Sequence, residues 1–269
     1  MPKFAANLSL LFTELDFLDR FASARSAGFD AVEFLFPYAF EPRQIAARLQ
    51  RYRLDLALFN LPAGDWAAGE RGIACDPRRI DEFRDGVQTA IDYALELGVK
   101  RLHCLAGIRP PRVEMERAHA TYVENLRHAA EECRFHELEL LIEPINDRDI
   151  PGYFLTGTSQ AAAVIAECGA ENLFLQYDIY HMQRMEGDLA ATIRRHLPLI
   201  RHIQLADVPG RHQPGTGEIN FPFLFDLLDE LGYAGWVGCE YAPLGATGDS
   251  LEWLAAQRTK SHAGELDRK

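Results

Sequence analysis

Short apolar runs alternate with longer amphipathic segments along the whole chain. The apolar runs are rich in Val, Leu, Ile and Phe, a composition typical of strands that are covered on both faces. They occupy residues 3–8, 31–36, 55–60, 101–106, 138–144, 173–178, 201–206 and 236–241. Between them apolar residues recur at helical spacing. This spacing predicts helices over residues 16–27, 41–52, 79–97, 115–136, 158–168, 188–197, 221–231 and 249–258.

One strand followed by one helix, repeated eight times, defines the expected fold class. Eight units in 269 residues average about 34 residues each, close to the size of a βαβ repeat. A single-domain (β/α)8 TIM barrel fits this count better than a doubly wound sheet. A dinucleotide-binding sheet would also need a glycine-rich turn after its first strand, where the chain has Asn7–Leu8–Ser9–Leu10. No Pro/Gly/Ser-rich or charged linker divides the middle of the chain, so two smaller domains are not indicated.

One connection is much longer than the others. Residues 61–79, between the third strand and its helix, contain three glycines and an aromatic residue, Trp66. Most loops in compact α/β units are short, and long ones are usually functional. We therefore expect this loop to cover a site, although a surface insertion without a role is the simpler alternative.

Composition and charge narrow the class of protein. The chain is 48% hydrophobic and 25% charged, with a net charge of −12, which excludes a disordered chain. The acidic balance argues against nucleic acid as a partner, because phosphate-backbone binding needs a concentrated basic surface. Five scattered cysteines without a CxxC pair predict reduced thiols and a cytoplasmic location. No signal peptide and no membrane partner are expected, because no stretch approaches about 18 uninterrupted apolar residues.

Oxygen-bearing side chains stand at the ends of the last four predicted strands: Glu143, Asp178, Gln204 and Glu240. The carboxyl ends of barrel strands meet at one face, where the chemistry of such barrels lies. A single acidic residue after a strand is more often a helix cap or an ion-pair partner. Three buried carboxylates side by side, however, need a compensating cation. The all-oxygen set predicts a divalent metal, with Mg²⁺ or Mn²⁺ as the best match.

Polar residues close to this cluster are candidates for substrate contacts. His181 follows Asp178 by three residues and could bond a substrate hydroxyl or ligate a second metal. Asn146 lies in the loop after the fifth strand, and Arg71 and Arg211 are candidate cations for an anionic substrate. Further polar residues near strand ends are Asn7, Asn60 and His103, whereas Glu33, Glu70 and Asp207 are interpreted as supporting or structural groups.

Long motifs are spread over nearly the whole chain: NLSLLF, AVEFLFPY, NLPAGDWAAGERGIAC, LLIEPIN, QYDIYHMQRMEGDL, PGTGEINF and GYAGWVGCEY. They closely resemble bacterial hydroxypyruvate isomerases, a family of the xylose-isomerase-like TIM-barrel superfamily. The resemblance runs from about residue 3 to about residue 258. We therefore expect one isomerase domain over residues 1–258 and a polar C-terminal tail over residues 259–269.

The resemblance also implies roles for the site residues. It places the metal on Glu143, Asp178, Gln204 and Glu240, and makes Glu143 and Glu240 the catalytic acid/base pair. His181 matches a substrate-contacting histidine of related sugar epimerases, and Arg211 lies near a substrate arginine of those enzymes, with different local spacing. Gln204 stands where the epimerases have a metal-binding histidine, which weakens the expected affinity for Co²⁺ or Zn²⁺. A homo-oligomer, dimer or tetramer, is implied as well.

The expected reaction interconverts hydroxypyruvate and 2-hydroxy-3-oxopropanoate (tartronate semialdehyde) through an enediolate. A related group isomerises 2-oxo-tetronates, but the long loop resembles the hydroxypyruvate enzymes more. A ketose 3-epimerase or isomerase would share the acid/base logic without needing a cation for a substrate carboxylate, a role we expect of Arg71. An abasic-site endonuclease would need a basic face and more metal-binding histidines. A non-catalytic binding protein is disfavoured by the intact carboxylate set.

Overall fold

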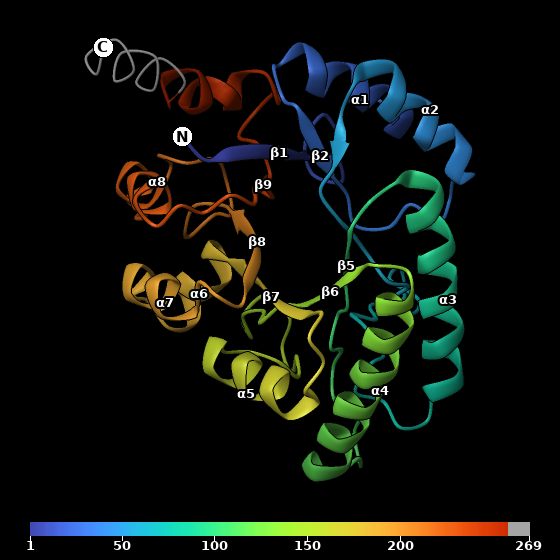
Figure 1. Ribbon diagram of the computed structural model, residues 1–269. Helices are drawn as coiled ribbons and strands as arrows, with labels where there is room; N and C mark the ends of the chain where they lie inside the picture. The colour runs from blue at the N-terminus through green and yellow to red at the C-terminus, as the bar shows by residue number, and fades with distance from the viewer. Residues whose placement is uncertain (258–269) are drawn as a thin grey trace.

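The computed structural model describes residues 1–257, and the expected tail over 259–269 lies outside the described residues. Within that range nine parallel strands curl into a near barrel with helices around the outside (Figure 1). Their order in the sheet is β3-β2-β1-β9-β8-β7-β6-β5-β4. The strands are β1 (Lys3–Asn7), β2 (Ala31–Glu33), β3 (Asp55–Leu56), β4 (Phe59–Asn60), β5 (Arg101–His103), β6 (Glu139–Ile142), β7 (Leu173–Asp178), β8 (Ile200–Leu205) and β9 (Trp236–Cys239). The single-domain TIM barrel predicted from the sequence is confirmed.

The third predicted strand is divided into β3 and β4, which explains nine strands where eight were expected. β3 pairs with β2, and β4 pairs with β5. The residue after each piece continues the same pairing. The amide of Ala57, after β3, donates to the carbonyl of Val32 at 2.8 Å. The amide of Leu61, after β4, donates to the carbonyl of His103 at 2.8 Å. The segment therefore turns from one neighbour to the other and joins the two edges of the sheet.

A helical segment follows every strand except β3, as the spacing of apolar residues predicts. The helices are α1 (Phe17–Ser26), α2 (Pro42–Tyr52), α3 (Ile80–Leu97), α4 (Met115–Phe135), α5 (Thr158–Cys168), α6 (Ile179–Met185), α7 (Leu189–His196) and α8 (Phe221–Glu230). The last helical segment is a 3₁₀ turn at Asp249–Leu251 that continues as α-helix over residues 252–257. α6 was not predicted, and it begins directly after Asp178, whose side chain accepts from the amides of Tyr180 and His181. An aspartate that ends a strand and also caps a helix explains this short addition.

The interior of the barrel changes from apolar to polar toward the carboxyl ends of its strands. Ala5, Ala31 and Ala57 form a small buried apolar cluster. Asn7 and Glu33 lie two residues further along β1 and β2, on the same face as Ala5 and Ala31. Both are buried, and the amide of Asn7 donates to Glu33 at 3.0 Å. The polar layer thus begins inside the barrel, beneath the strand ends that carry the candidate site.

The base of the long loop over residues 61–79 packs backbone to backbone against the segment after β5. Gly72 and Gly107 have φ angles of 109° and 97°, a region that favours glycine. A Cβ on Gly72 would lie 2.5 Å from the carbonyl oxygen of Leu105, and a Cβ on Gly107 would collide with the carbonyl oxygen of Gly72. The amide of Cys75 donates to the carbonyl of Ala106 at 2.9 Å. These backbone contacts fix the C-terminal half of the loop, around Gly72 and Cys75.

No helix among residues 1–257 combines the length and the apolar character that crossing a membrane requires. All five cysteines are buried.

Candidate active site

A cavity of about 260 Å³ opens at the carboxyl ends of the strands. Its lining includes four residues expected at the site: Glu143, Glu240, His181 and Arg211. Arg71 and Trp66, from the long loop, line it as well. A larger cavity of about 430 Å³ lies where several strands begin, but no carboxylate lines it. The smaller cavity is therefore the candidate active site, and the structure brings most of the predicted residues to it.

Glu143, Asp178 and His181 form a buried group that fits a metal ion. One potential ligand atom from each lies within 4.8 Å of the others. Oε1 of Glu143 and Oδ2 of Asp178 are buried without a hydrogen-bond donor among the described residues. Nε2 of His181 lies 3.5 Å from Oδ2 of Asp178 and 3.9 Å from Oε1 of Glu143. Two buried carboxylate oxygens that accept no hydrogen bond and lie this close together are compensated naturally by a cation.

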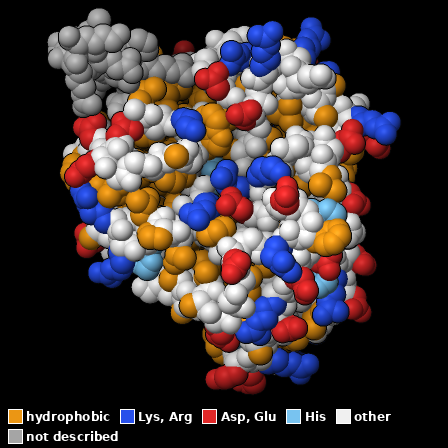
Figure 2. All heavy atoms as spheres, in the orientation of Figure 1, with side chains coloured by type: hydrophobic (Ala, Val, Ile, Leu, Met, Phe, Trp, Pro, Cys, Tyr) orange, Lys and Arg blue, Asp and Glu red, His pale blue; other side chains and the backbone are white. Residues whose placement is uncertain are grey.

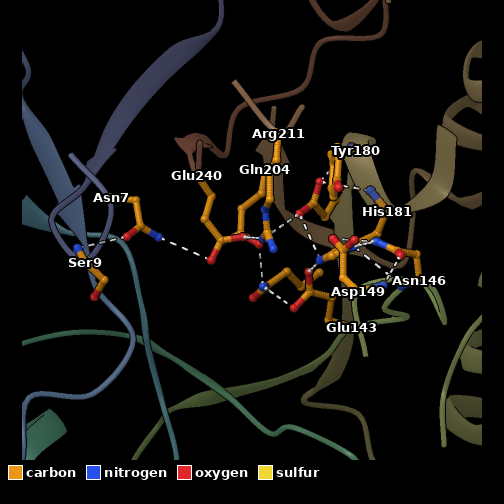
Figure 3. Close-up of polar contacts among 12 residues, drawn as sticks. Asn7, Ser9, Glu143, Asn146, Asp149, Tyr180, His181, Gln204, Arg211 and Glu240 are labelled. Carbon is orange, nitrogen blue, oxygen red and sulfur yellow. Dashed lines mark hydrogen bonds and ion pairs between the residues drawn. The ribbon is translucent and has the colours of Figure 1, made fainter. Parts of the chain in front are cut away.

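The amide of Asn146 sets the proton position on His181 (Figure 3). Its oxygen accepts from the backbone amides of Arg148 at 3.1 Å and Asp149 at 2.9 Å, so its nitrogen must face the imidazole. That nitrogen lies 2.6 Å from Nδ1 of His181 and donates to it. Burial also lowers the pKa of His181 well below its ordinary value. The neutral ring therefore carries its proton on Nε2 and faces the two carboxylates as a donor.

Two glutamine amides connect the carboxylates, and one of them, Gln176, lines the cavity. Nε2 of Gln176 donates to Oε2 of Glu143 at 3.1 Å and to Oε1 of Gln204 at 2.7 Å. Nε2 of Gln204 in turn donates to Glu33 at 2.8 Å. Glu33 also lies 2.6 Å from Nε2 of His202, in a fully buried pair. These contacts orient the Gln204 amide, with its oxygen toward Gln176 and its nitrogen toward Glu33.

Arg211 provides positive charge between two of the predicted ligands. Its Nη2 lies 2.7 Å from Oε2 of Glu240 and 3.7 Å from Oδ2 of Asp178. Oε1 of Glu240 receives a long hydrogen bond of 3.5 Å from Asn7 (Figure 3). Burial raises the pKa of Glu240 to about 8, although Arg211 opposes the shift. Burial also raises the pKa of Asp178, and burial together with Glu240 raises that of Glu143 well above its ordinary value.

Asp207 holds the loop that carries Arg211. Its two carboxylate oxygens accept from four backbone amides at 2.9–3.1 Å, those of Val208, Gly215, Gly217 and Ile219. The amide of Arg211 itself donates to the backbone carbonyl of Asp207 at 2.9 Å, and Arg211 adopts a positive φ of 57°. The sequence interpretation of Asp207 as a supporting group agrees with these contacts.

Replacing Asp207 by Ala is expected to lower the free energy of unfolding by about 3 kcal/mol, because four amides lose their acceptor. Thermal or denaturant unfolding would measure the loss. The exposed Asp226 on α8 offers a matched control, since Asp226→Ala should change stability by less than about 0.5 kcal/mol. Equal stability of the Asp207 and Asp226 variants would contradict the role assigned to Asp207.

The remaining predicted residue, Arg71, is held within its own loop. Its Nη1 donates to the backbone carbonyls of Trp66 at 3.1 Å and Glu70 at 2.7 Å. Its guanidinium lies 4.1 Å from the centre of the Trp66 ring, a cation–π contact. Both side chains line the cavity, so the long loop contributes to the site as expected.

Sequence reasoning did not include Gln176 among the site residues. Gln176 and Asp178 are separated by two positions in β7, so their side chains lie on the same face of the strand. A glutamine inside the otherwise hydrophobic stretch LFLQY, just before Asp178, is the signal that could have identified it. Its contacts to Glu143 and Gln204 place it at the centre of the polar layer.

Comparison with known proteins agrees with this fold. A family model described as a xylose isomerase-like TIM barrel matches residues 21–257. The chain is 53% identical to the hydroxypyruvate isomerase of Escherichia coli, over 96% of this chain and 100% of that protein. It is 50% identical to a 2-oxo-tetronate isomerase of Cupriavidus necator, over 94% and 98%. The crystal structure of a Brucella melitensis protein named AP endonuclease, family 2, superposes with a TM-score of 0.93 at 46% identity, covering 95% of this chain and 99% of that one.

The chain belongs to the xylose isomerase-like TIM-barrel family. It is a sugar-acid isomerase of the hydroxypyruvate isomerase and 2-oxo-tetronate isomerase kind, and relatives of both kinds are similarly close.

Proposed function

We propose that this enzyme interconverts hydroxypyruvate and 2-hydroxy-3-oxopropanoate. The observation that carries the proposal is a pair of buried glutamates, Glu143 and Glu240, lining one small cavity that also contains arginines. The reaction moves a proton from C3 to C2 of the acid and a second proton from the C3 oxygen to the C2 oxygen. Both directions pass through the same enediolate, so two acid/base groups and a stabilised oxyanion are sufficient.

Glu143 and Glu240 are the acid/base pair in this proposal. They reach the cavity from the ends of β6 and β9, and burial raises the pKa of both, to about 8 for Glu240, which suits groups that take and return protons. Arg71 and Arg211 line the same cavity and provide positive charge for the substrate carboxylate. Nε2–H of His181 donates to a substrate oxygen, in agreement with the substrate contact expected from the resemblance.

Glu143, Asp178, Gln204 and Glu240 are the residues that would hold a divalent metal. Carboxylate and amide oxygens make up this set, which favours Mg²⁺ or Mn²⁺. Gln176 and Glu33 keep the Gln204 amide oriented. When bound, such a metal supplies Lewis-acid stabilisation of the developing oxyanion.

The alternative substrates are 2-oxo-tetronates and neutral ketoses. The first share the carboxylate and the 2-oxo group, so the same acid/base pair and arginines would serve them. The ketoses lack a carboxylate that the cavity arginines could bind. The two cavity arginines therefore favour the acids over the ketoses.

A substrate panel tests the proposal. Hydroxypyruvate, a 2-oxo-tetronate and free ketoses would be incubated with the enzyme in deuterated water, and NMR would follow deuterium into the product carbon. We expect the largest kcat/KM with hydroxypyruvate. Faster turnover of the tetronate would reassign the substrate within the same kind of isomerase, and turnover of a ketose alone would refute the proposal.

An endonuclease activity, which the name of the Brucella melitensis protein suggests for that protein, is disfavoured here by charge and by the ligand set. The net charge is −12, and basic and acidic side chains are interspersed on the face shown in Figure 2. The group that fits a metal contains a single histidine, His181. Phosphate-backbone binding depends on concentrated positive charge, which these features do not supply.

A further inference from the structure

We propose that His103 is a substrate-contacting residue, with its Nε2 accepting a hydrogen bond from a hydroxyl of the sugar acid. The imidazole thereby favours 2-oxo acids that carry a neighbouring hydroxyl over those that lack one. The inference rests on the proposed function, since it concerns the same cavity, but it adds a specificity-determining residue.

The position of His103 is fixed by the barrel itself. It is the last residue of β5, it pairs in register with Asn60 at the end of β4, and it is 1% exposed. Both residues line the cavity. A side chain carried by a strand end is held more precisely than one carried by a loop, so the imidazole is suited to discriminate between similar ligands.

Asn60 determines which ring nitrogen of His103 is the acceptor. Nδ1 of His103 lies 3.0 Å from the amide oxygen of Asn60, and an amide oxygen can only accept. The ring proton is therefore on Nδ1, and Nε2 carries a lone pair.

Nε2 of His103 lacks a donor among residues 1–257. The atom is buried, and no hydrogen bond reaches it. The nearest acidic group is Glu143, whose Oε2 lies 3.5 Å away and already accepts from Gln176. A buried acceptor without a partner is costly, and it lies at the wall of the cavity.

A substrate hydroxyl is the donor that this arrangement fits. Hydroxypyruvate carries an O–H on the carbon next to its carbonyl, and pyruvate has the same skeleton without it. An acceptor left unpaired by the second ligand penalises that ligand specifically, which is how sites built for a hydroxyl discriminate. The proximity of Nε2 to Glu143 places the hydroxyl close to the proposed acid/base group.

Calorimetric dissociation constants of hydroxypyruvate and pyruvate test the inference on the metal-loaded enzyme. In His103→Phe we expect binding of hydroxypyruvate to weaken about tenfold, while binding of pyruvate changes by less than about twofold. The preference for the hydroxylated acid should therefore fall about tenfold. His103→Gln, which retains an acceptor, should recover part of it. The partly exposed His119 on α4 provides the control, because His119→Phe should leave both constants unchanged.

Two results would overturn the inference. An unchanged preference in both His103 variants would show that the ring only fills space or binds Glu143. An equal loss for both acids would show a general distortion of the cavity. Failure of the proposed function would be seen in a different experiment. The unsubstituted enzyme would then leave hydroxypyruvate unconverted in deuterated water, while its dissociation constants for hydroxypyruvate and pyruvate could still be measured.

Discussion

Replacing Glu240 by Gln is expected to lower kcat for the interconversion of the two acids by about 10²- to 10⁴-fold, the usual contribution of a positioned acid/base group. Glu143→Gln should have an effect of the same size. Glutamine keeps the shape of the side chain and an acceptor for Arg211 or Gln176. The barrel should therefore stay folded, and the lower kcat should result from slower proton transfer. Rates of deuterium incorporation from solvent would measure it directly.

The control for this experiment is Glu131→Gln, at an exposed position of α4. This variant should have the same kcat as the unsubstituted enzyme. Circular dichroism and thermal unfolding would confirm that all three variants are folded. Turnover within tenfold of the unsubstituted enzyme in either Glu143→Gln or Glu240→Gln would remove that residue from the acid/base role.

Removal of divalent metal is expected to lower turnover by a factor of about 100 or more, and added Mg²⁺ or Mn²⁺ should restore it. Dialysis against a chelator, followed by titration with each ion, would measure the effect. Activity that persists in protein shown by elemental analysis to hold no metal would contradict the metal site.

The pH dependence of stability provides a second readout that does not require activity. The pKa of Glu240 is raised to about 8 in the folded, metal-free protein, above the ordinary value near 4.5. Between these pH values the folded state keeps a proton that the unfolded state releases, so the free energy of unfolding falls as pH rises. Metal binding needs the ionised carboxylate. The rise in Tm caused by saturating Mg²⁺ or Mn²⁺ should therefore increase from pH 5 to pH 8, and a rise that decreases over this range would contradict the assignment.

The fold could be predicted from the sequence because each unit carries its own local signal. Apolar runs and helical spacing recur in every unit, and right-handed βαβ connections leave few alternatives. The division of the third strand could not be predicted, since it depends on which neighbour each residue of 55–61 reaches. α6 was missed because Asp178 was interpreted only as a strand end, whereas its side chain also caps the following helix.

The carboxylates of the site could be predicted because strand ends of a parallel barrel converge. The contacts of the polar layer beneath them could not. Asn7 and Glu33 were identified as polar residues near strand ends, but periodicity alone does not show which face points into the barrel, and Gln176 was missed. The pairing of Arg211 with Glu240 was equally inaccessible, because it depends on a loop conformation that Asp207 imposes through four backbone amides.

The backbone contact between Gly72 and Gly107 makes the cavity sensitive to substitutions outside its lining. A Cβ on either glycine would collide with backbone atoms of the other segment, so the two segments would have to separate. Arg71 directly precedes Gly72, and its guanidinium packs on the ring of Trp66. Both side chains line the cavity. A methyl group at Gly72 or Gly107 would therefore displace the positive charge and the aromatic ring that the loop contributes.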